Sequence, residues 1–482
     1  MKSFNNQALI VILLMPFFYS CSTYQMKMSD YSNELHSHQY NKAIKSIEKN
    51  KLLKHKRNIL LYNMELGRLH MLNNNLQKSN EYFNAADALL ESNYKNFKDV
   101  AISNLTNPMM ETYRGEEYEK LMVNYFKAIN YANLDKTVDA VVEARRITLA
   151  TNRLNEKFDG KISRYSKDPF VLNLQGLIYE MNGDWNNAFI AYRNAADVYL
   201  NENSVYYGVE IPNQLKQDLL HAANMIGFSD EQSRYENLFN QKLSLQKSDS
   251  TSELILFIEE GSAPVKEDNS IVITNTNGIG SYQYMDRYGA YVSVPFNHRN
   301  YGIKDDKISN IRTIKISLPS FRVVSNKSNS INIKVNDSEY IPELVEDFNS
   351  LAIKILDERY LSEIAKAMAR FIVKKTMEVG SSKLAESLAQ KKDDKMSEKE
   401  KKENKENAEN IGKAIGFLVN MTNTFTEKAD TRTWLSLPAY ISYVRIQLNP
   451  GENKIILNGS GKSININVTA KKGIQIRSVI FN

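Results

Sequence analysis

The fold of the N-terminal half is decided by residues 168–200, which read DPFVLNLQGLIYEMNGDWNNAFIAYRNAADVYL. Apolar residues follow a helical period on both sides of Asn182-Gly183-Asp184, so this stretch predicts two helices joined by a turn. Pro169 suits the first turn of the first helix. Small residues that let the helices approach closely, and tyrosines that fill the remaining space, stand at fixed steps: Gly176, Tyr179, Ala188, Tyr192 and Ala195.

The same steps recur twice nearer the N-terminus. One series is Gly67, His70, Ser79, Phe83 and Ala86, and a weaker one is Ala128, Tyr131, Ala140, Ala144 and Ile147. This pattern resembles the tetratricopeptide repeat, in which helix pairs stack into a solenoid. The series begin at 67, 128 and 176, and these intervals are not multiples of the ~34-residue repeat, so the array is irregular. We expect an α-helical domain over 29–245.

The resemblance to tetratricopeptide repeats implies a concave surface that binds other proteins and performs no chemistry. The residues expected to contact a partner lie on the first helix of the 168–200 pair, facing away from its packing positions: Asn173, Leu177 and Glu180. The alternative is a helical bundle whose groove is filled by its own chain.

The first residues of the chain have the layout of a secretory signal. Lys2 precedes an apolar run over 8–18, and Ser20 precedes Cys21, which is the single cysteine. The run is too short to span a membrane. The layout resembles the signal of bacterial lipoproteins, although Phe18 stands where their pattern has leucine. An ordinary cleaved signal or a buried N-terminal helix is the alternative.

The lipoprotein resemblance implies a signal peptide over 1–20 and fatty acylation, such as with palmitate, of Cys21 at the start of a leader over 21–28. It also implies that the protein is anchored by lipid in the outer membrane, facing the periplasm or the cell surface. Ser22 supports this location, because it is not the aspartate that retains lipoproteins in the inner membrane of some enteric bacteria.

The amino-acid composition limits which classes of protein the chain can belong to. The chain has 482 residues, of which 42% are hydrophobic, enough for real cores. The net charge of +6 is small for this size and spread along the chain, which argues against a nucleic-acid partner.

In the second half of the chain, the apolar residues follow the pattern of β-strands instead of helices. After a linker over 246–252, a β-rich domain over 253–482 is expected, resembling a β-sandwich with helices inserted over 341–425. Within that insertion, helices are expected over 341–356, 360–379 (stopped by Gly380) and 411–425, with a charged linker over 391–407. Strands are expected at 253–258, 270–274, 291–294, 313–317, 331–335, 439–448, 454–457, 463–469 and 473–481. The predicted fold class is therefore α+β and multidomain, an α-solenoid followed by this β domain.

Tyrosines cluster early in the β-rich region, with basic residues nearby. Tyrosines of this kind could stack on sugar rings and bind an envelope glycan. The residues expected to do so are Tyr282, Tyr284, Tyr288 and Tyr291. The alternative is a tyrosine-rich strand pair.

Five short stretches carry a second resemblance. The chain resembles a family of uncharacterised bacterial lipoproteins through YRGEEY (113–118), EARR (143–146), AFIAYRNA (188–195), EGSAPVK (260–266) and ADTRTWLSLP (429–438). The family implies no established activity. No zinc pair, nucleophile elbow or complete phosphate-binding loop is found. We therefore expect no enzyme activity, cofactor or metal, and a protein partner in the envelope.

Overall fold

The computed structural model describes residues 24–95, 108–157, 167–244, 252–275, 281–286, 289–297, 299, 313–327, 331–390 and 428–481. Cys21, the charged stretch 391–407 and the expected helix 411–425 lie outside them. Among the described residues, no helix is both long enough and apolar enough to cross a membrane.

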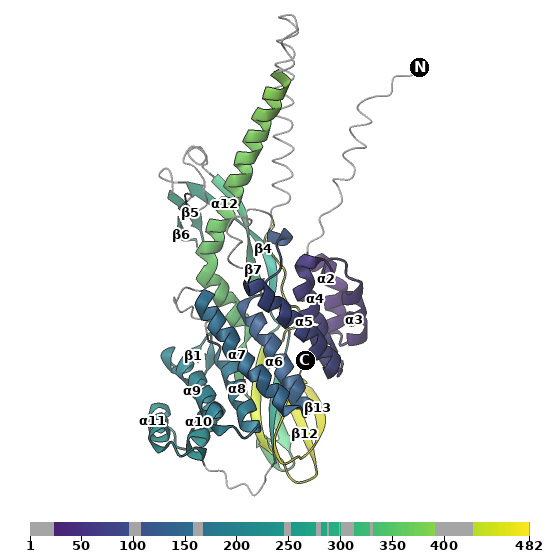
Figure 1. Cartoon of the computed structure of the whole chain (residues 1–482), viewed down its shortest axis with the longest axis vertical. Coiled ribbons are helices and arrows are strands. Elements are labelled where there is room, and N and C mark those ends of the chain that lie inside the picture. The colour runs from purple at the N-terminus through teal and green to yellow at the C-terminus, as the bar shows by residue number, and fades with distance from the viewer. Residues whose placement is uncertain are drawn as a thin grey trace, which may run out of the picture.

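The N-terminal half is an array of antiparallel helices, seen in purple to teal in Figure 1. The predicted pair over 168–200 forms α8 and α9. The side chain of Asp168 caps α8 by accepting from the backbone of Phe170 at 2.8 Å, and Asp184 caps α9 through Asn187 at 3.2 Å. The helices are α2 (Tyr24–His36), α3 (Tyr40–Lys49), α4 (Ile59–Leu72), α5 (Leu76–Lys95), α6 (Glu117–Asn133), α7 (Thr137–Lys157), α8 (Pro169–Met181), α9 (Trp185–Asn201), α10 (Asn213–Met225) and α11 (Ser229–Phe239).

Two glycines set how closely the helix pairs approach. A Cβ atom on Gly176 would lie 2.3 Å from Cδ1 of Tyr192, and one on Gly67 would lie 2.6 Å from Cδ1 of Phe83. Each aromatic ring therefore lies directly on the backbone of the facing helix, where any larger side chain would collide with it.

The C-terminal half contains three four-stranded sheets in the described residues, ordered β10-β11-β3-β14, β13-β12-β8-β9 and β6-β5-β4-β7. In the first sheet β3 pairs antiparallel with β11 and parallel with β14. A short hairpin joins β1 (Val205–Tyr206) to β2 (Val209–Glu210). The other strands are β3 (Ser252–Glu260), β4 (Val265–Asn275), β5 (Ser281–Met285), β6 (Tyr291–Pro295), β7 (Thr313–Arg322), β8 (Asn332–Val335), β9 (Ser338–Tyr340), β10 (Glu343–Asp347), β11 (Tyr440–Gln447), β12 (Glu452–Gly459), β13 (Lys462–Thr469) and β14 (Gly473–Ile480).

Strand β3 separates two cores. Leu254, Leu256 and Ile258 pack with strands β8, β11, β12 and β13, whereas Ile255 and Phe257 pack with the helices. Alternate residues of a strand point to opposite faces, so the sheet of β3 lies between the helical array and the sheet of β12. The helical array, the sheet of β3 and the sheet of β12 thus form three layers, and the β-sandwich expected for the C-terminal half is not confirmed as such.

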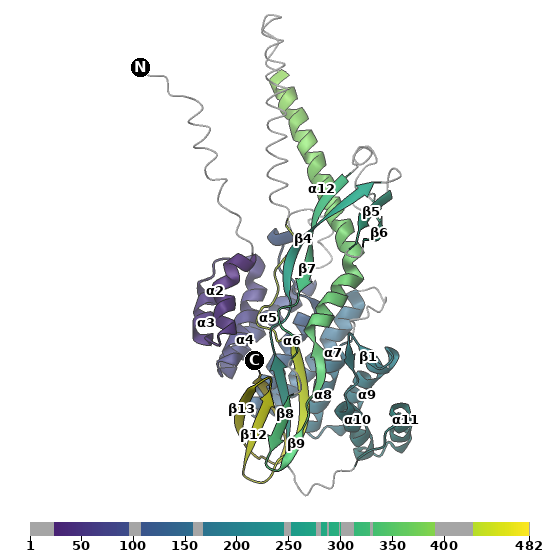
Figure 2. The same ribbon diagram turned by 180° about the vertical axis from the view of Figure 1, so that it is seen from behind.

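The helices inserted in the β-rich region have other bounds than the sequence predicts. Residues 343–347 form strand β10 because they pair with β11, and a single helix, α12 (Phe348–Gln390), then passes through position 380 without stopping. Figure 2 shows α12 in green, running along the sheet of β4 and β7 and projecting from the body of the molecule. Its first turns, from Phe348 to Ile355, belong to the core of the helical array, and its middle part buries Ile364, Met368 and Ile372 against that sheet.

The two halves share one core. Ile255, Phe257, Trp434 and Tyr443 from the C-terminal half belong to the same apolar cluster as the helices α2 to α10. The helical and β-rich regions therefore pack against each other through this cluster, and most of the expected linker over 246–252 lies outside the described residues. Helix α2 also begins at Tyr24, inside the expected leader over 21–28, and Tyr24 is buried.

Candidate functional site

The inner face of the helical array is occupied by the chain itself. Helices α4, α6 and α8 face the sheet of β3, and the segment 430–438, which turns at Leu435 and Ser436, lies against α4 and α6. In Figure 1 the strands of the C-terminal half lie alongside the helices of the array. The groove is therefore filled by the protein's own chain, as in the alternative to a partner-binding surface that the sequence left open.

Two buried carboxylates hold the backbone of the segment 430–438. Oε1 of Glu65 on α4 accepts from the backbone N–H of Leu435 at 2.8 Å, and Oε1 of Glu119 on α6 accepts from that of Trp434 at 2.8 Å. The hydroxyl of Ser436 also donates to Glu65, at 2.6 Å. Such contacts to main-chain N–H groups position a peptide backbone whatever its side chains are.

Two side chains of the segment fill pockets in the array. The indole of Trp434 packs edge-on against Phe83 and Phe126, with ring centroids 6.0 and 5.6 Å away, and is fully buried. The guanidinium of Arg432 donates to Asn58 Oδ1 at 2.7 Å and to the carbonyl of Glu111 at 2.9 Å. Aromatic and arginine side chains are the usual anchors of protein interfaces.

The expected partner-binding residues are buried under the sheet. Asn173, Leu177 and Glu180 are only 2%, 0% and 5% exposed. Glu180 forms an ion pair with Arg445 of strand β11 at 2.7 Å, and Arg445 also lies 3.2 Å from Asp218 of α10. The expectation that these residues contact a separate protein is wrong, because the sheet of β3 covers this face.

Burial changes the protonation of the groove carboxylates. It raises the pKa of Glu65 to about 7, against the hydrogen bonds from Ser436, Tyr31 and Leu435, which lower it. Burial also raises the pKa of Asp218. At Glu116 burial would raise the pKa, but Lys266 and Arg359 outweigh it and hold that pKa well below its usual range.

Three of the quoted sequence stretches meet at this junction. Glu116, from YRGEEY, pairs with Lys266, from EGSAPVK. Arg432, from ADTRTWLSLP, lies with its guanidinium carbon 5.3 Å from the centre of the Tyr113 ring. The sequence marks each stretch separately, but nothing local in it shows that they contact one another.

The remaining repeat positions lie inside the array. Tyr131 is half-buried, and the others are buried: Gly67, Phe83, Ala86, Ala128, Ala140, Gly176, Tyr179, Ala188, Tyr192 and Ala195.

The tyrosine patch does not form an open surface. Tyr282 and Tyr284 are buried in the cluster between the third sheet and α12, where Tyr284 contacts Tyr360 with ring centroids 6.1 Å apart. Tyr291 is exposed, and Tyr288 lies outside the described residues. Tyr282 and Tyr284 are therefore core residues of the strand pair and cannot stack on a glycan.

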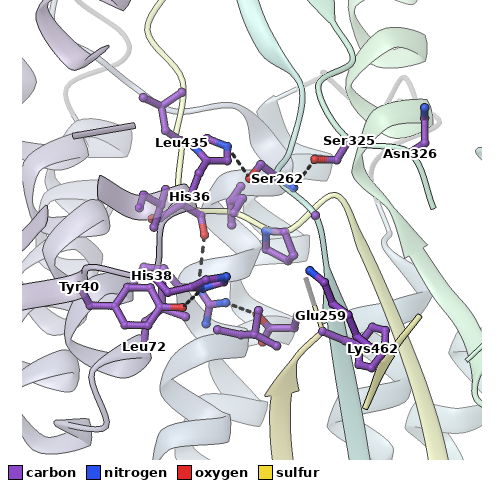
Figure 3. A pocket seen from close by; sticks show the side chains of 18 of the residues that line it. His36, His38, Tyr40, Leu72, Glu259, Ser262, Ser325, Asn326, Leu435 and Lys462 are labelled. Atoms are coloured by element: carbon purple, nitrogen blue, oxygen red, sulfur yellow. Dashed lines mark hydrogen bonds and ion pairs between the residues drawn. The ribbon is translucent and has the colours of Figure 1, made fainter. Parts of the chain in front are cut away.

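An open pocket of about 490 Å³ lies beside the groove, between the first helices and the sheet. Figure 3 shows His36, His38 and Tyr40 on its helical side and Glu259 and Lys462 on its sheet side. No local pattern in the sequence predicts this pocket, because it is lined by residues from seven separate parts of the chain. In the part of the chain that the structure describes, no cluster of His, Cys, Asp or Glu could hold a metal ion.

No protein family matches the sequence, and no curated protein matches it. Among solved structures, one crystal structure of MamA is 14% identical over 46% of this chain and 97% of that chain, with a TM-score of 0.28. A second crystal structure of MamA is 14% identical over 43% of this chain and 90% of that chain, with a TM-score of 0.27. TM-scores this low do not establish a shared fold or function.

Proposed function

We propose that this protein is a lipid-anchored scaffold of the bacterial cell envelope that binds a protein partner and catalyses no reaction. The partner docks on the outer face of the helical array, because the inner face is filled by the segment 430–438 and the sheet of β3.

A line of exposed apolar side chains on α7 carries this proposal. Val138, Val142 and Leu149 are 71%, 42% and 54% exposed. Their spacing of four and seven residues places them on one face of the helix. Exposed apolar residues aligned in this way are typical of a surface that a partner covers.

The groove beside this line indicates what kind of partner fits. It has a volume of about 400 Å³, and Val142 is part of its wall. Four carboxylates and one guanidinium line it: Asp87, Glu91, Asp139, Glu143 and Arg146. Lys127 pairs with Asp87 and Glu143, and Arg153 pairs with Glu91, so Asp139 is the lining carboxylate with no ion pair among the described residues. An apolar line beside this carboxylate suits an amphipathic helix that carries a basic side chain at its edge.

The position of the expected lipid supports an envelope role. Cys21 precedes Tyr24 by three residues, which span roughly 10 Å when extended. The hydroxyl of Tyr24 donates to the carbonyl of Thr433 at 3.1 Å, so this residue is fixed in the core. A lipid on Cys21 would hold the array close to the membrane surface, and the outer membrane is the location that we propose.

Photo-crosslinking from position 142 in intact cells tests the proposal, with position 272 on the exposed face of the third sheet as the matched control. Val142 should give an adduct that Val272 does not, and the crosslinked segment should be a basic amphipathic helix. Asp139→Lys should abolish that adduct, and exchanging the partner's basic residue for an acid should restore it. The same adducts from both positions, or no rescue by the charge exchange, would refute the proposal.

A further inference from the structure

The first two helices of the array and the loop after them are strongly basic. Residues 24–58, which contain α2, α3 and this loop, include eight lysine or arginine residues and three aspartate or glutamate residues. Their net charge is therefore +5, whereas the whole chain of 482 residues has a net charge of +6. Charged residues are spread along the sequence, but the excess of positive charge lies in these first elements.

The fold gathers five lysines around the start of α2. A short connection over 37–39 joins α2 to α3, so the two helices run antiparallel and the end of α3 lies beside the start of α2. Figure 1 shows both helices in purple at one edge of the molecule. We call the five lysines the basic patch: Lys27 on α2, Lys49 at the end of α3, and Lys51, Lys54 and Lys56 in and after the loop.

Two sets of contacts hold the loop in this place. Near its beginning, Nδ2 of Asn50 donates to the carbonyl of Lys27 at 3.4 Å and lies 3.3 Å from the sulfur of Met28. At its end, Oδ1 of Asn58 accepts from Arg432 at 2.7 Å, and the carbonyl of the next residue, Thr433, accepts from the hydroxyl of Tyr24 at 3.1 Å. Both ends of the loop therefore lie close to the first turns of α2.

The charges of the basic patch are available to an external partner. All five lysines are exposed, and none of them forms an ion pair with a residue that the structure describes. Like charges held together on a folded surface repel one another. An anionic surface that covers the patch would relieve this repulsion.

The position of the patch favours a lipid bilayer over other anionic partners. Cys21, which is expected to carry the lipid, precedes the fixed residue Tyr24 by three residues, or roughly 10 Å when extended. Met26, beside Lys27, is 62% exposed, and an apolar side chain among lysines suits the boundary between headgroups and acyl chains. A single acyl chain gives only marginal membrane binding, and a polybasic patch is one of the second signals that make it stable.

We propose that the basic patch binds the anionic phospholipid headgroups of the membrane in which Cys21 is anchored, and so holds α2 and α3 against the bilayer. The proposal rests on the proposed anchor for its location in the cell. It does not depend on the partner surface on α7.

Co-sedimentation with vesicles tests the binding. The protein is the unlipidated chain from Ser22 onwards, which contains every described residue. It should bind vesicles of phosphatidylcholine with phosphatidylglycerol at least about tenfold more tightly than vesicles of phosphatidylcholine alone. Salt at about 1 M, where the Debye length is about 3 Å, should abolish this binding. Equal binding to both vesicles, binding to neither, or binding that salt does not weaken would overturn the proposal.

A charge-matched pair of variants locates the binding. The triple variant Lys51→Gln, Lys54→Gln, Lys56→Gln should bind the anionic vesicles at least about tenfold more weakly. The control removes the same charge from three exposed lysines of the C-terminal half, and its binding should stay near that of the wild type: Lys334→Gln, Lys454→Gln and Lys472→Gln. An equal loss in both triple variants would show that net charge, and not the patch, attracts the protein to lipid.

A nucleic acid is the other anionic partner to test. If the unlipidated chain bound duplex RNA but not the anionic vesicles, the patch would be a nucleic-acid surface and the proposal would be wrong. The vesicle assay is independent of the anchor, because the chain used lacks Cys21. Vesicle binding without acylation of Cys21 in cells would refute the anchor alone, and acylation without vesicle binding would refute the basic patch alone.

Discussion

Glu119 of helix α6 accepts a hydrogen bond from the backbone N–H of Trp434 at 2.8 Å, across 315 positions of sequence. The carboxylate belongs to the helical array, and the amide belongs to the segment that enters β11. Oε2 of Glu119 is held within the helical half by Tyr113 and Glu116, whereas its Oε1 and the amide of Trp434 lose each other when either half unfolds. We therefore expect the two halves to unfold together.

Trp434→Ala should destabilise the whole chain. The indole is fully buried against Phe83 and Phe126, so its removal leaves a cavity that costs about 3–5 kcal/mol. Urea unfolding followed by circular dichroism should show one transition at a lower midpoint. Tyr291→Ala is the control, because Tyr291 is 66% exposed, and its midpoint should stay near that of the wild type. Equal midpoints for the two variants would contradict the packing.

Gly176→Leu should unfold both halves together. Even a Cβ atom would lie 2.3 Å from Tyr192, so the larger side chain forces α8 and α9 apart and costs roughly 1–3 kcal/mol or more. Because Glu180 of α8 is paired with Arg445 of β11, the sheet loses its support as well. Limited proteolysis should therefore release no stable fragment over 252–482. A resistant C-terminal fragment would mean that the sheet folds independently.

The stability of the protein should fall as pH rises from about 4.5 to about 7. The pKa of Glu65 is about 7 in the folded state against an ordinary 4.5, so the folded state holds a proton that the unfolded chain releases in this range. The loss from this group is up to ~3 kcal/mol. Glu116 acts in the opposite sense. Its pKa is lowered in the folded state, so its contribution to stability is lost only as the pH falls below the ordinary pKa of a glutamate.

Glu65→Gln isolates the first effect. Glutamine has a similar shape but does not titrate, so the decline in the free energy of unfolding between pH 5 and pH 8 should be smaller in this variant than in the wild type. Urea titrations at both pH values measure the difference. The same decline in both proteins would show that Glu65 keeps an ordinary pKa in the groove.

Cys21→Ser should abolish lipid attachment, because the chain has no other thiol to acylate. Metabolic labelling with a fatty-acid analogue should mark the wild type and leave the variant unlabelled, and the variant should leave the membrane fraction or keep its signal. Ser20→Ala is the control, since alanine is also accepted before the lipoprotein cysteine by the resemblance. Equal label on wild type and Cys21→Ser would refute the anchor.

Local features of the sequence predict much of the fold. The small residues around Gly176 follow a helical period, and Leu254, Leu256 and Ile258 follow the two-residue period of a strand. The helices and the strand that these short-range periods predict are present. Residues 343–347 have a helical pattern, but pairing with β11 makes them a strand, because tertiary contacts override weak local preference.

The filled groove could not be predicted in this way. Glu65 and Leu435 are 370 positions apart, and no period links a helix face to a segment at such a distance. A signal was nevertheless present in Glu180, which is the single charged residue of helix α8. A buried acid needs a partner, and Glu180 finds it in Arg445 of the C-terminal half.

Hydrogen exchange of the segment 430–438 tests the central claim most directly. If this segment fills the groove, the amides of Trp434 and Leu435 should exchange only through global unfolding, with the same protection as α4 and α6. Mass spectrometry of peptides from these three regions gives the comparison in one experiment. Exchange of Trp434 and Leu435 at the rate of an unstructured chain, while α4 and α6 stay protected, would show that the groove is open to another protein.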